Sequence, residues 1–198
     1  IRAAQESRGL GDVYKRQENI VVKNCQLGAQ PTGITCKVQE VNKLSFINNQ
    51  VYPDGRENLV LDACNNCVIE GNNFKSYYNG ILVLNGNDNT VNKNIFWLTG
   101  AVQNQLLDHG DDFGIINVKG NNNMVASNSL SCEWAYAGAV TVNAVQGTGN
   151  VFKNCFVDNL ESYRVFLVNA QTEVSNCVSS DKVSIVCLLY TSPSPRDS

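Results

Sequence analysis

An asparagine recurs along this chain at steps of 22 to 26 residues, with one longer step of 34. An apolar residue follows most of these asparagines after two positions, and another precedes most of them by three. The series consists of Asn24, Asn49, Asn72, Asn94, Asn128, Asn154 and Asn176. A fixed period of roughly 20 to 50 residues is typical of a solenoid, in which each repeat buries its apolar face by stacking on its neighbours. The repeat therefore constrains the architecture before any motif is considered.

Short runs rich in Val, Ile and Phe alternate with Asn- and Gly-rich clusters, for example NIVV, KLSFI, NLVL and GILVL. These runs are too short for helices, so strands are favoured. With the repeat, they predict an all-β parallel β-helix of about seven coils, each holding two or three strands. A propeller blade would need about 40 residues or more per repeat. The longer step predicts an insertion within Leu98–Phe113, and insertions in solenoids often form the binding face.

Asparagine is unusually frequent, with 28 copies among 198 residues. Asn suits tight turns and tolerates left-handed backbone angles, which a coil with several corners requires. Stacked Asn side chains can also form hydrogen-bonded ladders. The composition therefore agrees with the predicted solenoid.

Both ends of the chain read like translated sequencing adapters. Residues 7–17 (SRGLGDVYKRQ) back-translate to a transposase-type adapter, and residues 187–197 (CLLYTSPSPRD) read as its reverse complement in another frame. We therefore predict a non-native segment over 1–17, a β-helix domain fragment over 18–186 and a non-native tail over 187–198. The alternative is a genuine basic arm and a Pro/Ser-rich tail.

The charge of the chain limits its partners. The formal net charge is −3 for the whole chain and −5 for residues 18–186. A mildly acidic surface argues against nucleic acid or an anionic membrane as a partner. No apolar run approaches the roughly 18 residues of a membrane span.

Seven of the eight cysteines lie within 18–186, and an odd number argues against a closed disulfide framework. Cys25, Cys155 and Cys177 each follow a repeat Asn, so they are expected at equivalent positions as small buried residues. A disulfide between stacked coils is the alternative. Cys64 and Cys67 form a lone CxxC, which is weak evidence for zinc and rather indicates a turn before the strand around Val68.

The densest polar cluster, DHGDD, lies in the predicted insertion. Its side chains could hold a cation or sugar hydroxyls, or simply cap a solvated loop. Further candidates for substrate contact are an Arg and a Glu near a β-turn, two aromatic residues suited to stacking on sugars, and a third carboxylate. The full set of candidates is Asp108, His109, Asp111, Asp112, Arg56, Glu57, Tyr77, Tyr78 and Glu133.

Several motifs occur in the order in which they occur in one family of β-helical enzymes. They are NN followed by P-x-G-R over 48–56, C-N-x-C over 64–67, N-x-F-x-x-x-Y-x-G over 72–80, LNG over 84–86, DD-x-G over 111–114, I-x-V-x-G-x-NN over 116–123 and G-x-G-N-V over 147–151. On these motifs, the segment from about Asn48 to Ser179 resembles the inulin fructotransferases, which form difructose anhydrides (DFAs).

This resemblance implies a right-handed, pectate-lyase-like β-helix that acts on inulin or another fructan without a metal or an organic cofactor. It implies intramolecular transfer: a carboxylic acid protonates the leaving fructosyl oxygen, and a hydroxyl of the terminal difructosyl unit closes the anhydride. It also implies a homotrimer in the full-length protein. Residues Asn24 to Thr35 match the coil after the one that bears the family's catalytic Asp and Glu. The catalytic pair is therefore expected upstream of Glu18, which leaves no catalytic residue in this chain and predicts that the fragment alone is inactive.

Two other functions agree with the same sequence. One is a different β-helical polysaccharide lyase or hydrolase, although a uronate lyase would need clustered Lys and Arg. The other is a non-catalytic β-helical carbohydrate-binding protein such as a tailspike, because fold alone does not decide function.

The resemblance generates a prediction for the insertion. In a homotrimer with active sites between subunits, Asp108, Asp111 and Asp112 would form one wall of a neighbour's site. Alanine at each position in the full-length enzyme should lower turnover or affinity for inulin, measured by steady-state kinetics. Unchanged turnover and affinity would contradict this role.

Overall fold

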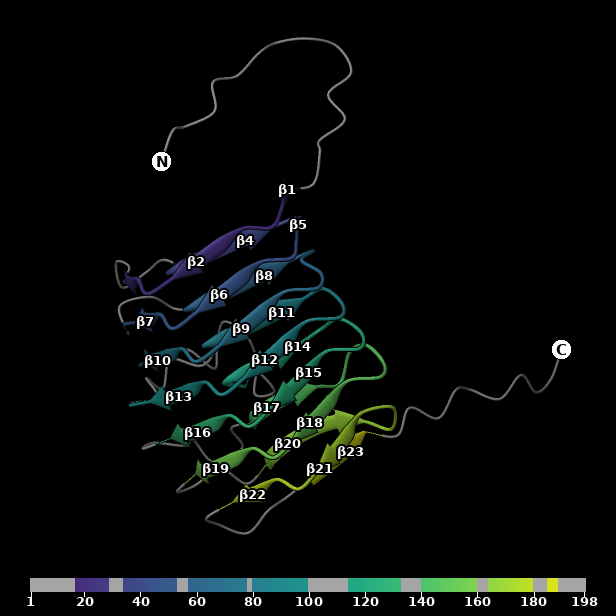
Figure 1. The fold of residues 1–198 in the computed structure, drawn as a ribbon. Helices are drawn as coiled ribbons and strands as arrows, with labels where there is room; N and C mark the ends of the chain where they lie inside the picture. The colour runs from purple at the N-terminus through teal and green to yellow at the C-terminus, as the bar shows by residue number, and fades with distance from the viewer. Residues whose placement is uncertain are drawn as a thin grey trace, which may run out of the picture.

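The computed structural model of this chain describes residues 17–28, 34–52, 57–77, 80–99, 114–132, 140–159, 164–179 and 185–188. Within these ranges, every regular element is a β-strand, and the paired strands run parallel. The chain winds in repeated coils that stack into a solenoid (Figure 1). The prediction of an all-β parallel β-helix is therefore confirmed.

Three seven-stranded parallel sheets form the sides of the solenoid. Sheet 1 consists of β2 (Val21–Lys23), β6 (Ser45–Ile47), β9 (Val68–Glu70), β12 (Thr90–Asn92), β15 (Met124–Ala126), β18 (Val151–Lys153) and β21 (Glu173–Ser175). Sheet 2 consists of β3 (Gln26–Leu27), β7 (Gln50–Val51), β10 (Asn73–Ser76), β13 (Ile95–Leu98), β16 (Ser129–Cys132), β19 (Phe156–Asn159) and β22 (Val178–Ser179).

Sheet 3 consists of β4 (Cys36–Gln39), β8 (Leu59–Asp62), β11 (Leu82–Asn85), β14 (Ile116–Val118), β17 (Val140–Ala144), β20 (Arg164–Asn169) and β23 (Ile185–Leu188). A short pair, β1 (Gln17–Glu18) and β5 (Val41–Asn42), lies outside these sheets. Each coil passes through sheets 1, 2 and 3 in that order. Strands β1 and β23 cross the boundaries expected at 18 and 186, which remain predictions.

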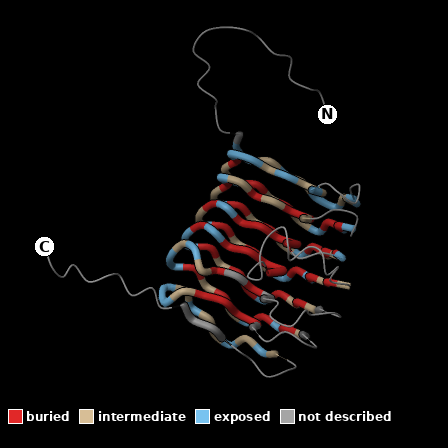
Figure 2. Tube along the Cα trace, turned by 180° about the vertical axis from the view of Figure 1, so that it is seen from behind, coloured by how far each residue is buried: buried red, intermediate tan, exposed pale blue. Residues whose placement is uncertain are grey.

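The core fills the inside of the coils. Residues alternate between the two faces of each strand, so every second side chain points inward. The inward positions stack coil on coil, and Figure 2 shows them as continuous buried rows. On sheet 2, the rings of Phe74 and Phe96 are stacked. Their centroids lie 5.0 Å apart and the angle between their planes is 1°. Such stacking follows directly from the in-register pairing of β10 with β13.

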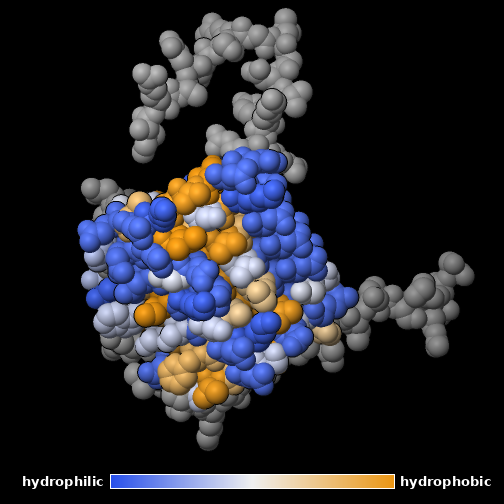
Figure 3. Space-filling view, viewed as in Figure 1, coloured by the Kyte–Doolittle hydropathy of each residue, from blue (hydrophilic) through white to orange (hydrophobic). Residues whose placement is uncertain are grey.

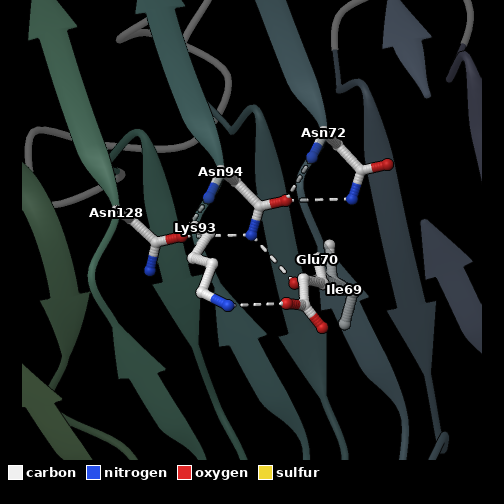
Figure 4. A network of polar contacts seen from close by, with 6 residues as sticks. All are labelled: Ile69, Glu70, Asn72, Lys93, Asn94 and Asn128. Atoms are coloured by element: carbon white, nitrogen blue, oxygen red, sulfur yellow. Dashed lines mark hydrogen bonds and ion pairs between the residues drawn. The ribbon is translucent and has the colours of Figure 1, made fainter. Parts of the chain in front are cut away.

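A ladder of buried asparagines forms the corner between sheets 1 and 2. It consists of Asn49, Asn72, Asn94 and Asn128, which are separated by 23, 22 and 34 residues in the chain. At Asn94, the Oδ1 atom accepts bonds from the backbone N–H and the Nδ2 of Asn72, at 2.8 and 2.9 Å. Its Nδ2 donates to the carbonyl of Ile69 at 2.9 Å and to Oδ1 of Asn128 at 3.0 Å (Figure 4). All four hydrogen-bonding positions of the amide are therefore used.

A second ladder lies at the corner where the chain enters sheet 1. It consists of Asn89, Asn123 and Asn150, all at most 1% exposed. The Oδ1 of Asn123 accepts from the backbone N–H of Asn89 at 3.0 Å, and its Nδ2 donates to the carbonyl of Gly86 at 3.0 Å. Backbone groups that a corner leaves unpaired are satisfied in this way without water. The prediction that stacked Asn side chains form ladders is confirmed at both corners.

The residue before each ladder position turns the chain with a positive φ angle. Asn48, Lys93, Ser127 and Asn154 have φ of 53° to 54°, and Gly71 has φ of 67°. This left-handed conformation is uncommon for residues other than Gly and Asn. Asn48 and Asn154 suit this turn through their backbone tolerance, whereas Lys93 and Ser127 show that other residues also adopt it.

In three coils, the repeat asparagine read from the sequence lies one residue before the ladder position. β3 pairs with β7 through Leu27 and Val51, which places Cys25 at the ladder position of Asn49. Cys25 donates its backbone N–H to Oδ1 of Asn49 at 3.0 Å. Asn24 instead has the turn φ of 55°. The ladder positions at the opposite end of the series are likewise Cys155 and Cys177, while Asn154 and Asn176 form the turns.

This displacement corrects which apolar side chains form the core. Phe156 and Val178 are the apolar residues two positions after Asn154 and Asn176, yet they point outward and are 46% and 60% exposed. Val157 is the inward residue of β19 and is 1% exposed. The physical reason is the period of two along a strand, because a shift by one residue exchanges the two faces.

Cys25, Cys155 and Cys177 do occupy equivalent positions, as expected. Cys155 is buried, whereas Cys25 and Cys177 are only partly buried, and all three thiols are free. Cys67 directly precedes β9, which confirms the turn expected at the CxxC motif. The insertion expected within Leu98–Phe113 begins where β13 ends.

The ladder makes a prediction about stability. Replacing Asn94 with Ala removes four hydrogen bonds and leaves buried partners unpaired, so the free energy of unfolding should fall by about 3 kcal/mol. Urea unfolding followed by circular dichroism measures the change. Asn92→Ala is the matched control, because Asn92 lies two residues away on the outer face of β12 and is only partly buried. Its effect should stay within about 0.5 kcal/mol. Equal losses in both variants would contradict the importance of the ladder.

Candidate functional site

The segments that join sheet 2 to sheet 3 carry the candidate residues that the sequence indicated. Glu57 and Tyr77 lie at the ends of such joining segments and are described by the structure. Tyr77 directly follows β10, points outward and is 45% exposed. The other candidates lie outside the described residues, so their roles remain predictions: Asp108, His109, Asp111, Asp112, Arg56, Tyr78 and Glu133.

The joining segments leave sheet 2 along a single edge. Its strands are parallel and in register, so their carboxyl ends lie side by side. The backbone pairing continues past the strands, since Thr99 N–H donates to the carbonyl of Ser76 at 2.8 Å. Where the chain enters sheet 3, Gly80 N–H donates to the carbonyl of Gly114 at 2.8 Å. The strand ends from which these joining segments start therefore lie along one line parallel to the solenoid axis.

Three side chains form a row on the outer face of sheet 2 beside this edge. Lys75 and Trp97 are register partners on β10 and β13. Tyr52 follows β7. Its N–H donates to the carbonyl of Leu27 at 2.8 Å, which extends the backbone pairing of β7 with β3 by one residue. Since Val51 pairs with Phe74, Tyr52 lies opposite Lys75. We call Tyr52, Lys75 and Trp97 the outer row.

The outer row combines aromatic surface with a cation. The Nζ atom of Lys75 lies 4.3 Å from the centroid of the Trp97 ring, which is a cation–π contact. Tyr52 is 44% exposed, and Tyr77 adds a further ring two residues beyond Lys75 on the same face. Successive strands lie about 4.8 Å apart, so the row presents one side chain from each coil at about this spacing along the solenoid axis. Aromatic rings beside a hydrogen-bond donor are typical of sites for small polar ligands.

A buried amide lies beneath the outer row. Asn58 is 0% exposed, and its Nδ2 donates to the backbone carbonyl of Lys75 at 2.8 Å. Among the described residues, its Oδ1 atom has no hydrogen-bond partner. An unpaired buried acceptor costs roughly 1–3 kcal/mol. Asn58 thus fixes the backbone of Lys75 and keeps an acceptor without a donor next to the row.

Tyr52, Lys75 and Trp97 are not among the candidates predicted from the sequence. A signal was present, because each follows directly after an inward apolar residue of the repeat, namely Val51, Phe74 or Phe96. Alternation alone makes these positions outward. Only the register between coils shows that the three outward positions are neighbours.

Asp62 does not suit the role of a general acid. The pKa of Asp62 is lowered, first by a hydrogen bond from Gln39 at 3.0 Å, then by one from Asn85 at 2.8 Å and by Lys37 at 3.9 Å. A general acid for glycosidic chemistry needs the opposite shift. Asp62 lies on the outer face of sheet 3, with Gln39 and Asn85 as register partners. The amides of Gln39 and Asn85 thus stabilise the charge of Asp62 on the sheet surface.

The described residues contain no group of three or more His, Cys, Asp or Glu side chains that could hold a metal ion. They also contain no helix long and apolar enough to cross a membrane. The face of the molecule in Figure 3 is mostly hydrophilic, with separate small groups of apolar side chains.

The parallel coils, the three sheets and the stacked corners define a class of protein. The family model for the right-handed β-helix region matches residues 32–194, so the chain belongs to the right-handed β-helix family. This establishes the handedness expected from the sequence. A search of curated proteins found no match.

Among solved structures, the chain is similar to DFA-IIIase from Arthrobacter chlorophenolicus A6. The complex with GF2 matches with a TM-score of 0.71 and 20% identity, over 90% of this chain and 48% of that chain. The form without its lid gives a TM-score of 0.70 and 20% identity, over 84% and 48%. The complex with DFA-III gives 0.69 and 20% identity, over 85% and 47%. This chain thus shares the fold of DFA-IIIase and spans about half the length of that protein.

The lowered pKa of Asp62 predicts a dependence of stability on pH. A carboxyl group whose pKa is below its ordinary 3.8 in the folded protein stabilises the fold above that pH, and the contribution is lost as the pH falls. Because Asp62 is largely solvated, the effect should be small, roughly a few tenths of a kcal/mol. Asp62→Asn should therefore show a smaller loss of unfolding free energy between about pH 6 and pH 3 than the unmodified protein.

Urea unfolding at a series of pH values provides the measurement for this prediction. Lys37→Gln is the comparison variant, because it removes only the weakest of the three contacts that lower the pKa of Asp62. It should change the pH dependence less than Asp62→Asn does. The opposite order would show that the hydrogen bonds from Gln39 and Asn85 do not dominate.

Proposed function

We propose that this chain is part of a fructan-active β-helical enzyme of the inulin fructotransferase type, and that the outer row helps to bind its substrate. The observation that carries the proposal is the match to DFA-IIIase in complex with GF2, with a TM-score of 0.71 over 90% of the chain. The motifs over residues 48–151 support the same family independently. The relatives are about twice as long, so the proposal concerns the activity of a longer protein.

The chemistry of the outer row suits a neutral sugar chain. The faces of Tyr52 and Trp97 can stack on the apolar C–H faces of sugar rings, and the ammonium of Lys75 can donate to their hydroxyl groups. The row runs along the solenoid axis, so an oligosaccharide bound there would present successive units to successive coils. The described surface next to the row does not gather the basic residues that a polyuronate would need, since only Lys75 carries a positive charge in the row.

The proposed reaction is intramolecular transfer within a terminal difructosyl unit. A carboxylic acid protonates the leaving fructosyl oxygen, while a hydroxyl of the same unit attacks the anomeric carbon and closes the anhydride. Asp62, with its lowered pKa, does not suit the acid role. We therefore retain the expectation that the catalytic Asp and Glu belong to a coil upstream of Glu18. We also retain a homotrimer for the full-length protein.

Binding tests the role of the outer row. Isothermal titration of the chain with GF2 and with short inulin oligosaccharides should give binding that Trp97→Ala and Tyr52→Ala each weaken roughly tenfold, about 1.4 kcal/mol. Ile95→Ala is the matched control, because Ile95 lies two residues before Trp97 on the same outer face and is 50% exposed. Its affinity should stay within about twofold. Equal affinities in all variants would contradict the proposed role.

Turnover tests the enzyme itself. The full-length protein should release a new anhydride product from inulin and none from pectin or alginate, as followed by chromatography. Products from pectin or alginate alone would favour a different β-helical polysaccharide enzyme. Binding of fructans through the outer row without any turnover would favour a non-catalytic carbohydrate-binding β-helix.

A further inference from the structure

Two cysteines occupy the asparagine-ladder position on neighbouring coils. Cys155 precedes β19 and Cys177 precedes β22, and these strands pair through Phe156 and Val178. The N–H of Val178 donates to the carbonyl of Cys155 at 2.9 Å, which fixes the two coils against each other at this point. The ladder has no amide here, so its column continues as two stacked thiols.

The two cysteines occupy stacked positions and are differently exposed. The hydrogen bond from the thiol of Cys155 lowers the pKa of Cys177 to about 7. The same bond and burial raise the pKa of Cys155. Cys155 is 3% exposed, whereas Cys177 is only partly buried. Cys177 is therefore the more exposed of the two residues and suits the role of the nucleophile.

We propose that Cys155 and Cys177 are a site of oxidation that forms a disulfide between two coils, with a small-molecule disulfide such as oxidised glutathione as the oxidant. The thiolate of Cys177 attacks one sulfur of the oxidant, the S–S bond of the oxidant breaks, and one glutathione leaves as a thiol. Cys155 then loses its proton and attacks the sulfur of Cys177, which releases the second glutathione. Two protein thiols are oxidised and one glutathione disulfide is reduced to two thiols.

The geometry of stacked coils permits this bond. Parallel strands lie about 4.8 Å apart, within the Cα separation of about 4.4–6.8 Å that disulfides require. The Cβ atoms of a disulfide lie about 3.5–4.5 Å apart, so the two coils must move slightly closer together at this point. β22 is the last strand of sheet 2 in the described residues and pairs there only with β19. Because β19 and β22 pair in register, Cys155 and Cys177 lie at neighbouring positions that a disulfide can join.

Cys64 and Cys67 provide an internal comparison. Their thiols are also in contact, since the pKa of Cys64 is lowered by a hydrogen bond from Cys67. Both residues, however, are 0% exposed. The neighbouring backbone is very close, because a Cβ atom added at Gly86 would lie 1.8 Å from the carbonyl oxygen of Cys64. This pair has neither access for an oxidant nor room to move, so it should stay reduced in the folded protein.

The disulfide would link the coil that contains β19 to the coil that contains β22. It would close a loop of about 20 residues between β19 and β22, which restricts the unfolded chain. The melting temperature should therefore rise on the order of 5–10 °C when the bond forms.

Peptide mapping by mass spectrometry tests the proposal. The folded chain is incubated with oxidised glutathione, free thiols are alkylated, and the digest is searched for linked peptides. The expected result is a peptide pair joined through Cys155 and Cys177, with Cys64 and Cys67 alkylated. A lasting mixed disulfide between glutathione and Cys177, or a bond between Cys64 and Cys67 in its place, would overturn the proposal, as would two unmodified thiols.

Two variants complete the test. Cys155→Ser should leave Cys177 as a stable mixed disulfide, and it should abolish the rise in melting temperature. Cys25→Ser is the matched control, because Cys25 occupies the same ladder position but lies next to Asn49 instead of a second thiol. It should leave both the Cys155–Cys177 link and the rise unchanged. A rise that persists in Cys155→Ser would contradict the assignment.

Discussion

The buried amide of the ladder asparagine is the interaction on which this solenoid depends. A coil with three sides must turn at corners, and each corner leaves backbone N–H and C=O groups inside the protein without a strand partner. At Asn72 and Asn94 the side chain accepts from one coil and donates to the next, so the corner is satisfied by its neighbours. The amides must be in register for this to occur. The same register then aligns the strands, the stacked Phe74 and Phe96, and the outward rows.

The cysteine coils show how specific this requirement is. At Cys25, Cys155 and Cys177 the amide is absent, and an Asn remains one residue earlier, where its tolerance of positive φ is used instead. The pattern of Asn and apolar residues therefore continues through these coils shifted by one residue. The apolar residue two positions after the Asn, such as Phe156, then points to the outer face instead of the core. Asn has two separate physical uses at these corners, and a sequence pattern does not distinguish them.

The solenoid also explains how a binding surface can be assembled from distant residues. Tyr52, Lys75 and Trp97 belong to three successive coils, yet the pairing of β7, β10 and β13 places them side by side. The segments that carry Asp108 and Glu133 are attached along the same edge. This repetition along the solenoid axis is the basis for the proposed binding of a fructan at this edge. The similarity to DFA-IIIase concerns the fold.

The sequence by itself determined the class of fold, the insertion between Leu98 and Phe113, and the strands, because these follow from the local alternation and the repeat length. It also indicated the joining segments as the place of the candidate residues. Only the tertiary structure decided the phase of each coil, the outer row and the contact between Cys155 and Cys177. The reason is physical: strand formation depends on residues close in sequence, whereas register is set by hydrogen bonds between residues more than 20 positions apart, such as the 22 that separate Asn72 from Asn94.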